Sequence, residues 1–250
     1  MIPSVLFKYQ AASTRSLQNL RESVLFFSSP LAFNDPFDCA LSIFDGSPSA
    51  EDVVAFHKLY RPRAADPAEY DRRYGSPGVP NEAFANEIRS KIAKGPPGGF
   101  AHMVGVACFT ERHDELLMWS HYADGHRGIC LSFATDSLPF SRALQVKYSR
   151  EVPRMRAVSV ITQGVDEALV DALILTKAEQ WSYEREWRLV VKGGSQPVGY
   201  ARDCLRTVYL GAAISEVQRD EVRSILAESP TRVVAMERPT DLFVVRPLAP

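Results

Sequence analysis

The sequence lacks both a long apolar run and a surplus of charge of one sign. No stretch approaches the roughly 20 apolar residues that a membrane-spanning helix needs, and the opening MIPSVLFKYQ has no basic start followed by a long apolar region. Lysine and arginine number 29 against 30 aspartate and glutamate, so the net charge is −1. A generic nucleic-acid binder usually carries a basic excess. We therefore expect a cytoplasmic protein with no membrane partner and no generic binding of nucleic acid.

Cysteine is also scarce, and its spacing is uninformative for metal binding. Cys39, Cys108, Cys130 and Cys204 are far apart in the chain and form no C-x-x-C pair. Zinc sites and disulfide frameworks show closer or more regular spacings. The sequence therefore predicts four reduced, largely buried thiols.

Several catalytic and cofactor-binding motifs are missing. The chain has neither G-x-G-x-x-G nor G-x-x-x-x-G-K-[ST], so the usual phosphate-cradling loops are absent. It also lacks H-E-x-x-H and G-x-S-x-G. His121 and His126 are five residues apart, which is a poor spacing for two metal ligands on one helix. These absences weigh against a P-loop enzyme, a zinc hydrolase and an α/β-hydrolase.

The apolar pattern predicts an α+β fold, with a mixed, largely antiparallel sheet and flanking helices. We expect a single domain over residues 1–250, with a helical insertion at about 45–99 that is rich in proline and glycine. The predicted strands are 5–9, 24–28, 103–110, 128–133, 145–148, 186–192, 207–210, 232–237 and 242–246. The predicted helices are 14–22, 50–59, 67–74, 81–94, 114–124, 165–180 and 215–227. Their predicted caps are Ser13 or Thr14 for the first, Ser49 for the second and Ser215 for the last.

The segment FNDPFD at residues 33–38 is the first that could carry chemistry. Asn34 and Asp35 favour local turns, because their side chains bond to nearby backbone. In one interpretation the turn only stabilises itself, while Phe33 and Phe37 fill the core. In the other, the rigid turn presents Asn34, Asp35 or Asp38 to a ligand.

The segment LMWSHYA at residues 117–123 places three amphipathic side chains within four residues. Trp119 and Tyr122 need polar partners if they are buried, and His121 is of the type that most often moves protons near neutral pH. In one interpretation, the apolar residues of this segment simply form a helix face that packs in the core. The alternative is that His121 and Tyr122 belong to an active site.

The segment WSYEREWR at residues 181–188 leads into a predicted strand. If strand geometry begins near Glu184, then Glu184, Glu186 and Arg188 share one face, and Trp187 and Leu189 line the other. The three charged groups could form a solvated face. Alternatively, Arg188 could clamp a phosphate or carboxylate, and one glutamate could bind a ribose hydroxyl or act as a base.

Weaker candidates stand where the first two predicted strands end. These are Lys8 and Tyr9, then Ser28 and Ser29. Sheet folds often place ligand contacts at strand ends, which is the only reason to select them.

Together these segments resemble a known family. The blocks are FKY (7–9), LFFSSPLAFNDPFD (25–38), ACFTE (107–111), LMWSHYADGHRGICLSF (117–133), WSYEREWRLV (181–190) and YLG (209–211). The combination of FNDPFD, MWSHYA and YEREWR is similar to the bacterial domain-of-unknown-function family 2971. The resemblance spans nearly the whole chain, and residues 45–99 fit it only loosely.

The order of features also resembles the ADP-ribosyltransferase superfamily. That resemblance implies an enzyme that uses NAD as its substrate, a small-molecule nucleotide, in a toxin or phage-defence role. Glu186, with Glu184 and His121, would be catalytic, and Glu186 would hold the ribose hydroxyl. Tyr122 or Trp119 would stack on nicotinamide, and Arg188 or Lys8 would meet the pyrophosphate.

Two other functions remain open. A metal-dependent nucleotide or phosphodiester hydrolase would use Asp35, Asp38 and Glu186, with His121 as acid or base. A non-enzymatic module would use the same aromatic and acidic segments to bind a ligand or a partner without turnover.

Overall fold

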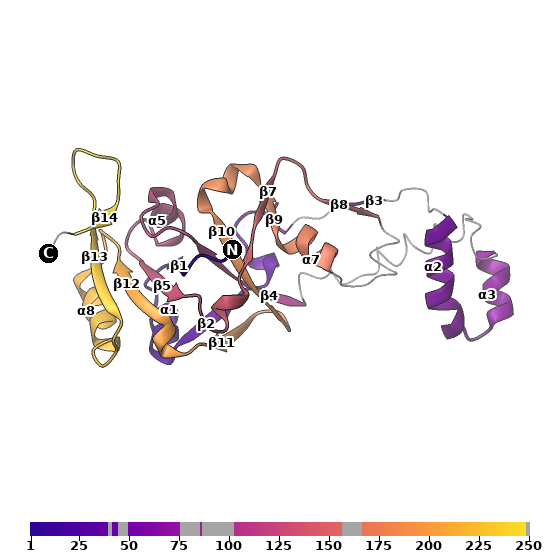
Figure 1. The fold of residues 1–250 in the computed structure, drawn as a ribbon, viewed down its shortest axis with the longest axis horizontal. Helices are drawn as coiled ribbons and strands as arrows, with labels where there is room; N and C mark the ends of the chain where they lie inside the picture. Colours follow the sequence, from indigo (N-terminus) through magenta and orange to yellow (C-terminus); the bar gives the residue numbers. More distant parts are fainter. Residues whose placement is uncertain (40–41, 45–49, 76–85, 87–102, 157–166, 249–250) are drawn as a thin grey trace. The chain divides into compact units, whose positions relative to one another are not determined.

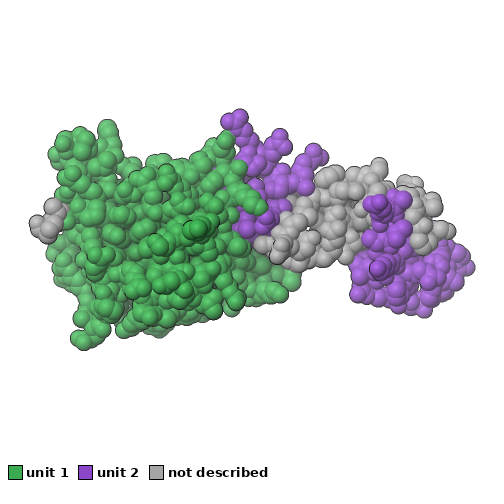
Figure 2. All heavy atoms as spheres, in the orientation of Figure 1, with its two compact units in different colours: residues 1–34, 100–148, 179–250 green, residues 35–99, 149–178 purple. Residues whose placement is uncertain are grey.

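A computed structural model gives the fold, and it describes residues 1–39, 42–44, 50–75, 86, 103–156 and 167–248. The chain divides into two compact units, coloured separately in Figure 2. Unit 1 comprises residues 1–34, 100–148 and 179–250, and unit 2 comprises residues 35–99 and 149–178. The single domain over residues 1–250 stays a prediction.

An eight-stranded sheet forms the centre of unit 1, in the order β14-β13-β12-β5-β1-β4-β10-β6 (Figure 1). Its strands are β1 (Val5–Gln10), β4 (Val104–Thr110), β5 (Ile129–Ala134), β6 (Leu144–Gln145), β10 (Glu186–Lys192), β12 (Leu205–Leu210), β13 (Arg232–Glu237) and β14 (Arg246–Pro247). Only β12 and β13 pair in parallel, and the other neighbours are antiparallel. With its flanking helices, this sheet confirms the predicted α+β fold.

Helices cover the two faces of this sheet. They are α1 (Thr14–Glu22), α5 (Leu116–Tyr122) and α8 (Glu216–Ile225). Leu17, Leu20 and Val222 from α1 and α8 belong to the main core, whereas Met118 and Trp119 from α5 belong to a separate core cluster. Of the two caps predicted for α1, the structure uses Ser13, whose hydroxyl accepts the Ser16 N–H. The predicted cap of α8 is confirmed, because the Ser215 hydroxyl accepts the Gln218 N–H.

The alternation predicted for residues 128–133 is confirmed in β5. Ile129, Leu131 and Phe133 join the core under α1 and α8, whereas Cys130 joins the core under α5. All six residues of β5 are buried. The strand therefore lies between two apolar layers, and its alternation separates two cores rather than core from solvent.

Smaller elements complete unit 1. The strand β2 (Val24–Phe27) pairs with β11 (Gln196–Gly199), a strand that the sequence did not predict. The remaining short elements are η1 (Pro30–Ala32), η4 (Phe140–Arg142), β7 (Lys147–Ser149), η5 (Glu179–Glu184) and η6 (Arg202–Cys204).

Unit 2 contains a helical hairpin and short strands. Its elements are β3 (Ser42–Phe44), α2 (Ala50–Tyr60), η2 (Arg61–Arg63), α3 (Pro67–Tyr74), β8 (Arg154–Arg156), α7 (Glu167–Ile174) and β9 (Thr176–Ala178). Val53 and Phe56 of α2 pack with Tyr70 and Tyr74 of α3. Helices α2 and α3 confirm two of the predicted helices. Apart from Asn86, the predicted helix 81–94 lies outside the described residues, as does the predicted cap Ser49.

Three predicted boundaries are wrong. The helix predicted at 165–180 ends at Ile174, and the chain then becomes the extended strand β9. The helix predicted at 114–124 starts only at Leu116, because Glu115 is extended and its N–H donates to the Tyr9 hydroxyl at 3.3 Å. The last strand is Arg246–Pro247 rather than 242–246, with Glu237 opposite Arg246.

The cysteines behave as predicted. Cys39, Cys130 and Cys204 are buried, Cys108 is half-buried, and within the described part of the chain none of the four forms a disulfide.

Among the residues that the structure describes, no helix is long and apolar enough to cross a membrane.

Candidate functional site

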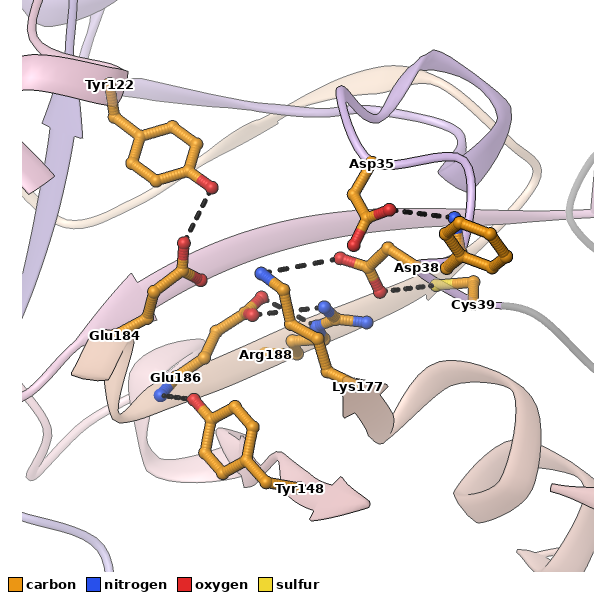
Figure 3. A network of polar contacts seen from close by, with 10 residues as sticks. Asp35, Asp38, Cys39, Tyr122, Tyr148, Lys177, Glu184, Glu186 and Arg188 are labelled. Atoms are coloured by element: carbon orange, nitrogen blue, oxygen red, sulfur yellow. Dashed lines mark hydrogen bonds and ion pairs between the residues drawn. The ribbon is translucent and has the colours of Figure 1, made fainter. Parts of the chain in front are cut away.

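The start of β10 carries a buried ion pair between Glu186 and Arg188. The two side chains lie on the same face of the strand, and Trp187 and Leu189 point into the main core. Arg188 Nε donates to Glu186 Oε1 at 2.7 Å, and Arg188 Nη2 donates to Oε2 at 3.1 Å (Figure 3). The side chain of Arg188 is 0% exposed and that of Glu186 is 3% exposed. The predicted shared face is therefore confirmed for Glu186 and Arg188, but the interpretation of a solvated face is wrong.

The neighbouring strands supply two more polar groups. In the antiparallel register, Cys108 of β4 lies opposite Arg188. Lys8 of β1 donates from Nζ to the Cys108 carbonyl at 3.2 Å. Burial lowers the pKa of Lys8, against the opposing effects of Cys108 and Glu186. Burial, together with the Glu186 charge, raises the pKa of Cys108 well above its ordinary value. Cys108 is therefore a protonated thiol at neutral pH rather than a nucleophile.

Glu184 is a second buried carboxylate beside the start of β10. It is 2% exposed and accepts a hydrogen bond from the Tyr122 hydroxyl at 2.7 Å (Figure 3). Glu184 ends η5, and Arg185 after it has a positive φ of 45°, so β10 begins only at Glu186. The prediction that strand geometry begins near Glu184 is wrong. The turn at Arg185 separates the two acids, and each is held by its own donor.

Tyr148 fixes the backbone at the same place. The N–H of Glu186 donates to the Tyr148 hydroxyl at 2.8 Å (Figure 3). The guanidinium of Arg188 lies over the ring of Phe33, 5.5 Å from its centroid. Sequence reasoning did not select Tyr148, Phe33 or Cys108 as parts of this site. Their proximity depends on strand pairing between distant segments, for which the sequence carries no local signal.

Two aromatic residues predicted to bind a cofactor are structural in this arrangement. Trp119 is 0% exposed, and its indole N–H donates to the His113 carbonyl at 2.8 Å. Tyr9 is buried against Trp119, and its hydroxyl donates to the Arg112 carbonyl at 3.0 Å. Burial raises the pKa of Tyr9. Both rings are enclosed in the core under α5, so we do not retain them as ligand contacts.

His121 does not point into the buried cluster. It is exposed on α5, and its ring centroid lies 6.2 Å from that of Trp181. Ser28 is half-buried, and its backbone makes an isolated bridge to Val106. Asn34 is exposed. Of the residues predicted in unit 1, the structure therefore brings together Lys8, Glu186 and Arg188 at one point, and Tyr122 with Glu184 at another.

Asp35 and Asp38 belong to unit 2. The Asp35 carboxylate accepts the Phe37 N–H at 2.9 Å, so the predicted self-stabilised turn is present. Phe37 is 67% exposed, and the prediction that it fills the core is wrong. Asp38 forms a buried ion pair with Lys177 at 3.5 Å and accepts the Cys39 thiol at 3.6 Å (Figure 3). Sequence reasoning missed Lys177, because it placed this residue within a helix.

Potential metal ligands do not gather in the described parts of the chain. No group of three or more histidine, cysteine, aspartate or glutamate side chains is placed there to hold a metal ion.

Comparison with known proteins adds one finding. Residues 118–189 match the family described as "Protein of unknown function (DUF2971)". The matched segment runs from α5 to β10 and includes Tyr122, Tyr148, Glu184, Glu186 and Arg188. It supports the resemblance to this family over that segment. Searches of curated proteins and of solved structures gave no match.

Proposed function

We propose that this chain is an enzyme that cleaves the bond between ribose and nicotinamide in NAD, as an ADP-ribosyltransferase or NAD glycohydrolase. The observation that carries the proposal is the pair of buried carboxylates Glu184 and Glu186, each held by a side-chain donor. Cleavage of a glycosidic bond passes through an oxocarbenium-like state, and enzymes commonly stabilise that state with two carboxyl groups. The resemblance to ADP-ribosyltransferases points to the same chemistry.

The proposed step conserves atoms and charge. The C1′–N bond breaks, and its electron pair leaves with neutral nicotinamide. Glu186 stabilises the positive charge that develops on the ribose and holds a ribose hydroxyl. Water or an acceptor nucleophile then bonds to C1′ and gives up its proton to Glu184. Tyr122 orients Glu184 through its hydroxyl.

Arg188 takes a positioning role in this proposal. Two of its N–H groups bind Glu186, which fixes the direction of that carboxylate. This differs from the sequence interpretation, in which Arg188 clamps the pyrophosphate. Lys8 places a second basic group near Glu186, and in its charged form it favours an anionic ligand at this place.

The test is nicotinamide release from NAD by the purified full chain, measured by chromatography. We expect Glu186→Gln and Glu184→Gln each to lower the rate by at least about 100-fold. Glu216→Gln is the matched control, because Glu216 lies on α8 with its side chain 82% exposed, and its rate should equal that of the unchanged protein. Tyr122→Phe is a second variant in case Glu186→Gln does not fold. Absence of release by the unchanged protein would overturn the proposal.

Two further measurements distinguish the alternative functions from NAD cleavage. A metal-dependent hydrolase would cleave nucleotides only with added Mg²⁺ or Mn²⁺ and would lose activity with a chelator. A binding module would show heat of NAD binding by calorimetry without release of nicotinamide. Asp38, a proposed ligand of the metal alternative, is already paired with Lys177.

A toxin or phage-defence role belongs to the same proposal and has its own test. Expression of the unchanged protein in bacteria should deplete cellular NAD and slow growth, whereas Glu186→Gln should do neither. Normal NAD and normal growth, despite activity of the purified protein, would remove the cellular role and leave the enzyme assignment in place.

A further inference from the structure

A cavity of about 490 Å³ lies between α5 and the loop that joins β13 to β14. Leu116 and His126 form one side, and loop residues that include Arg238, Asp241 and Phe243 form the other. An ion pair between Arg246 Nε and Glu237 Oε1, 2.7 Å long, joins the strands where this loop begins and ends. Pockets of this size accommodate small organic ligands.

His126 is held rigidly at the edge of this cavity. Its backbone has a positive φ of 68°, which is uncommon outside glycine. Its N–H donates to the Trp119 carbonyl at 3.1 Å, and its own carbonyl accepts the Ala213 N–H at 2.9 Å. The imidazole is nearly parallel to the Trp119 ring, at 12° and 6.3 Å between centroids. The neighbouring segments therefore fix both the position and the plane of the ring.

Ser120 is the hydrogen-bond partner of one imidazole nitrogen of His126. The Ser120 hydroxyl donates to the Leu116 carbonyl at 3.1 Å and lies 3.2 Å from His126 Nε2. A hydroxyl has one proton to donate. When that proton is on the bond to Leu116, Nε2 donates to Ser120. Nδ1 of a neutral imidazole then carries a lone pair and no proton.

That lone pair has no hydrogen-bond partner among the residues that the structure describes. His126 is 7% exposed, and Nδ1 is buried. Burial and the nearby Arg238 lower the pKa of His126, which keeps the ring neutral at physiological pH. An unsatisfied buried acceptor carries a free-energy cost. A group that brings an N–H to this nitrogen would recover that cost.

The other lining residues complement a molecule with both signs of charge. Arg238 and Asp241 are exposed, and neither forms an ion pair with any residue that the structure describes. Leu116, Leu242 and Phe243 add apolar surface, and Phe243 is 100% exposed. The cavity thus combines a cation, an anion, a neutral acceptor and apolar walls.

We propose that this cavity binds an apolar zwitterion, of the class of apolar α-amino acids and their short peptides. The ammonium group donates to His126 Nδ1 and pairs with Asp241. The carboxylate pairs with Arg238, and the apolar side chain packs on Leu242 and Phe243. This site does not depend on the NAD chemistry proposed at β10.

Calorimetry with L-phenylalanine, L-leucine and the dipeptide Leu-Phe tests the proposal on the full chain. N-acetyl-L-phenylalanine lacks the ammonium and L-phenylalaninamide lacks the carboxylate, so each should bind at least about tenfold more weakly than L-phenylalanine. Arg238→Ala and Asp241→Asn should weaken L-phenylalanine by a similar factor. Arg223→Ala is the matched control on α8 and should bind normally. Failure of all three ligands to bind would overturn the proposal. So would an affinity of Arg238→Ala and Asp241→Asn for L-phenylalanine equal to that of the unchanged protein.

A direct readout at His126 completes the test. In ¹⁵N spectra of the histidine rings, the free protein should show His126 with its proton on Nε2. Binding of the ligand should shift the Nδ1 resonance, as expected when a bare nitrogen accepts a hydrogen bond. An unchanged Nδ1 resonance at saturating ligand would show that the ligand binds elsewhere and would remove His126 from the proposal.

Discussion

At the scale of single residues, the pair of Glu186 and Arg188 should dominate the energetics of the site. Removal of one partner from a buried pair leaves an uncompensated charge, which costs about 3–5 kcal/mol. We expect Arg188→Met to lower the free energy of unfolding by about that amount. The double variant Glu186→Leu with Arg188→Met should recover a substantial part of the loss, because no buried charge of the pair then remains.

Urea unfolding followed by tryptophan fluorescence measures both effects. The control is Arg127→Met, which breaks a bidentate pair with Asp124 whose side chains are 58% and 51% exposed. Exposed pairs contribute little to stability, so this variant should unfold almost as the unchanged protein does. Equal effects of Arg188→Met and Arg127→Met would mean that solvent screens the pair on β10.

At the scale of elements, the turn after α5 and the turn after β12 are packed backbone against backbone. A Cβ atom added at Gly211 would lie 2.2 Å from the His126 carbonyl oxygen, which no side-chain movement can relieve. We expect Gly211→Ala to lower the free energy of unfolding by about 2 kcal/mol or more.

The matched control for Gly211 is Gly199 of β11. A Cβ atom added there would meet no atom of the described residues within 4 Å. Gly199→Ala should change the free energy of unfolding by no more than about 0.5 kcal/mol, because it only restricts the unfolded chain. Thermal unfolding of both variants compares them directly. Similar unfolding temperatures for Gly211→Ala and Gly199→Ala would show that the backbone after α5 and the backbone after β12 can move apart at little cost in free energy.

The elements that the sequence predicted well are those whose signals are local. Helix α1 has its cap at Ser13, and β5 has a strict alternation of side chains, so both could be found within one window of sequence. Helix α5 was predicted too long because its start depends on the hydroxyl of Tyr9, which comes from the first strand. No local pattern reports such a contact between distant segments.

The candidate site was predictable in part for the same reason. The spacing of Glu186 and Arg188 places both on one face of a strand, but spacing does not tell whether that face is buried. The pairing of Glu184 with Tyr122 joins positions 62 residues apart. Lys177 was assigned to a helix, and its partner Asp38 could not be deduced from either segment alone.

At the scale of the whole molecule, stability should depend on pH through two histidines of unit 1. Burial lowers the pKa of His113, against the opposing effect of Asp114, and burial lowers the pKa of His126. The ordinary value in an unfolded chain is about 6.5. Below that pH the unfolded chain takes up protons that the folded chain refuses, so stability falls as the pH decreases.

The three tryptophans, Trp119, Trp181 and Trp187, all lie in unit 1 and therefore report its unfolding selectively. We expect the urea midpoint from their fluorescence to rise between pH 5 and pH 7. The free energy of unfolding should rise with it by at most about 1.4 kcal/mol per pH unit for each histidine. His126→Asn should flatten this dependence, because asparagine accepts a positive φ and does not titrate. His121→Asn is the control, since His121 is exposed on α5, and its profile should match that of the unchanged protein.

A urea midpoint that falls from pH 5 to pH 7 would contradict this prediction, because the folded unit would then bind these protons more tightly than the unfolded chain. In that case His126 would be charged, and its Nδ1 could not accept an N–H from a ligand.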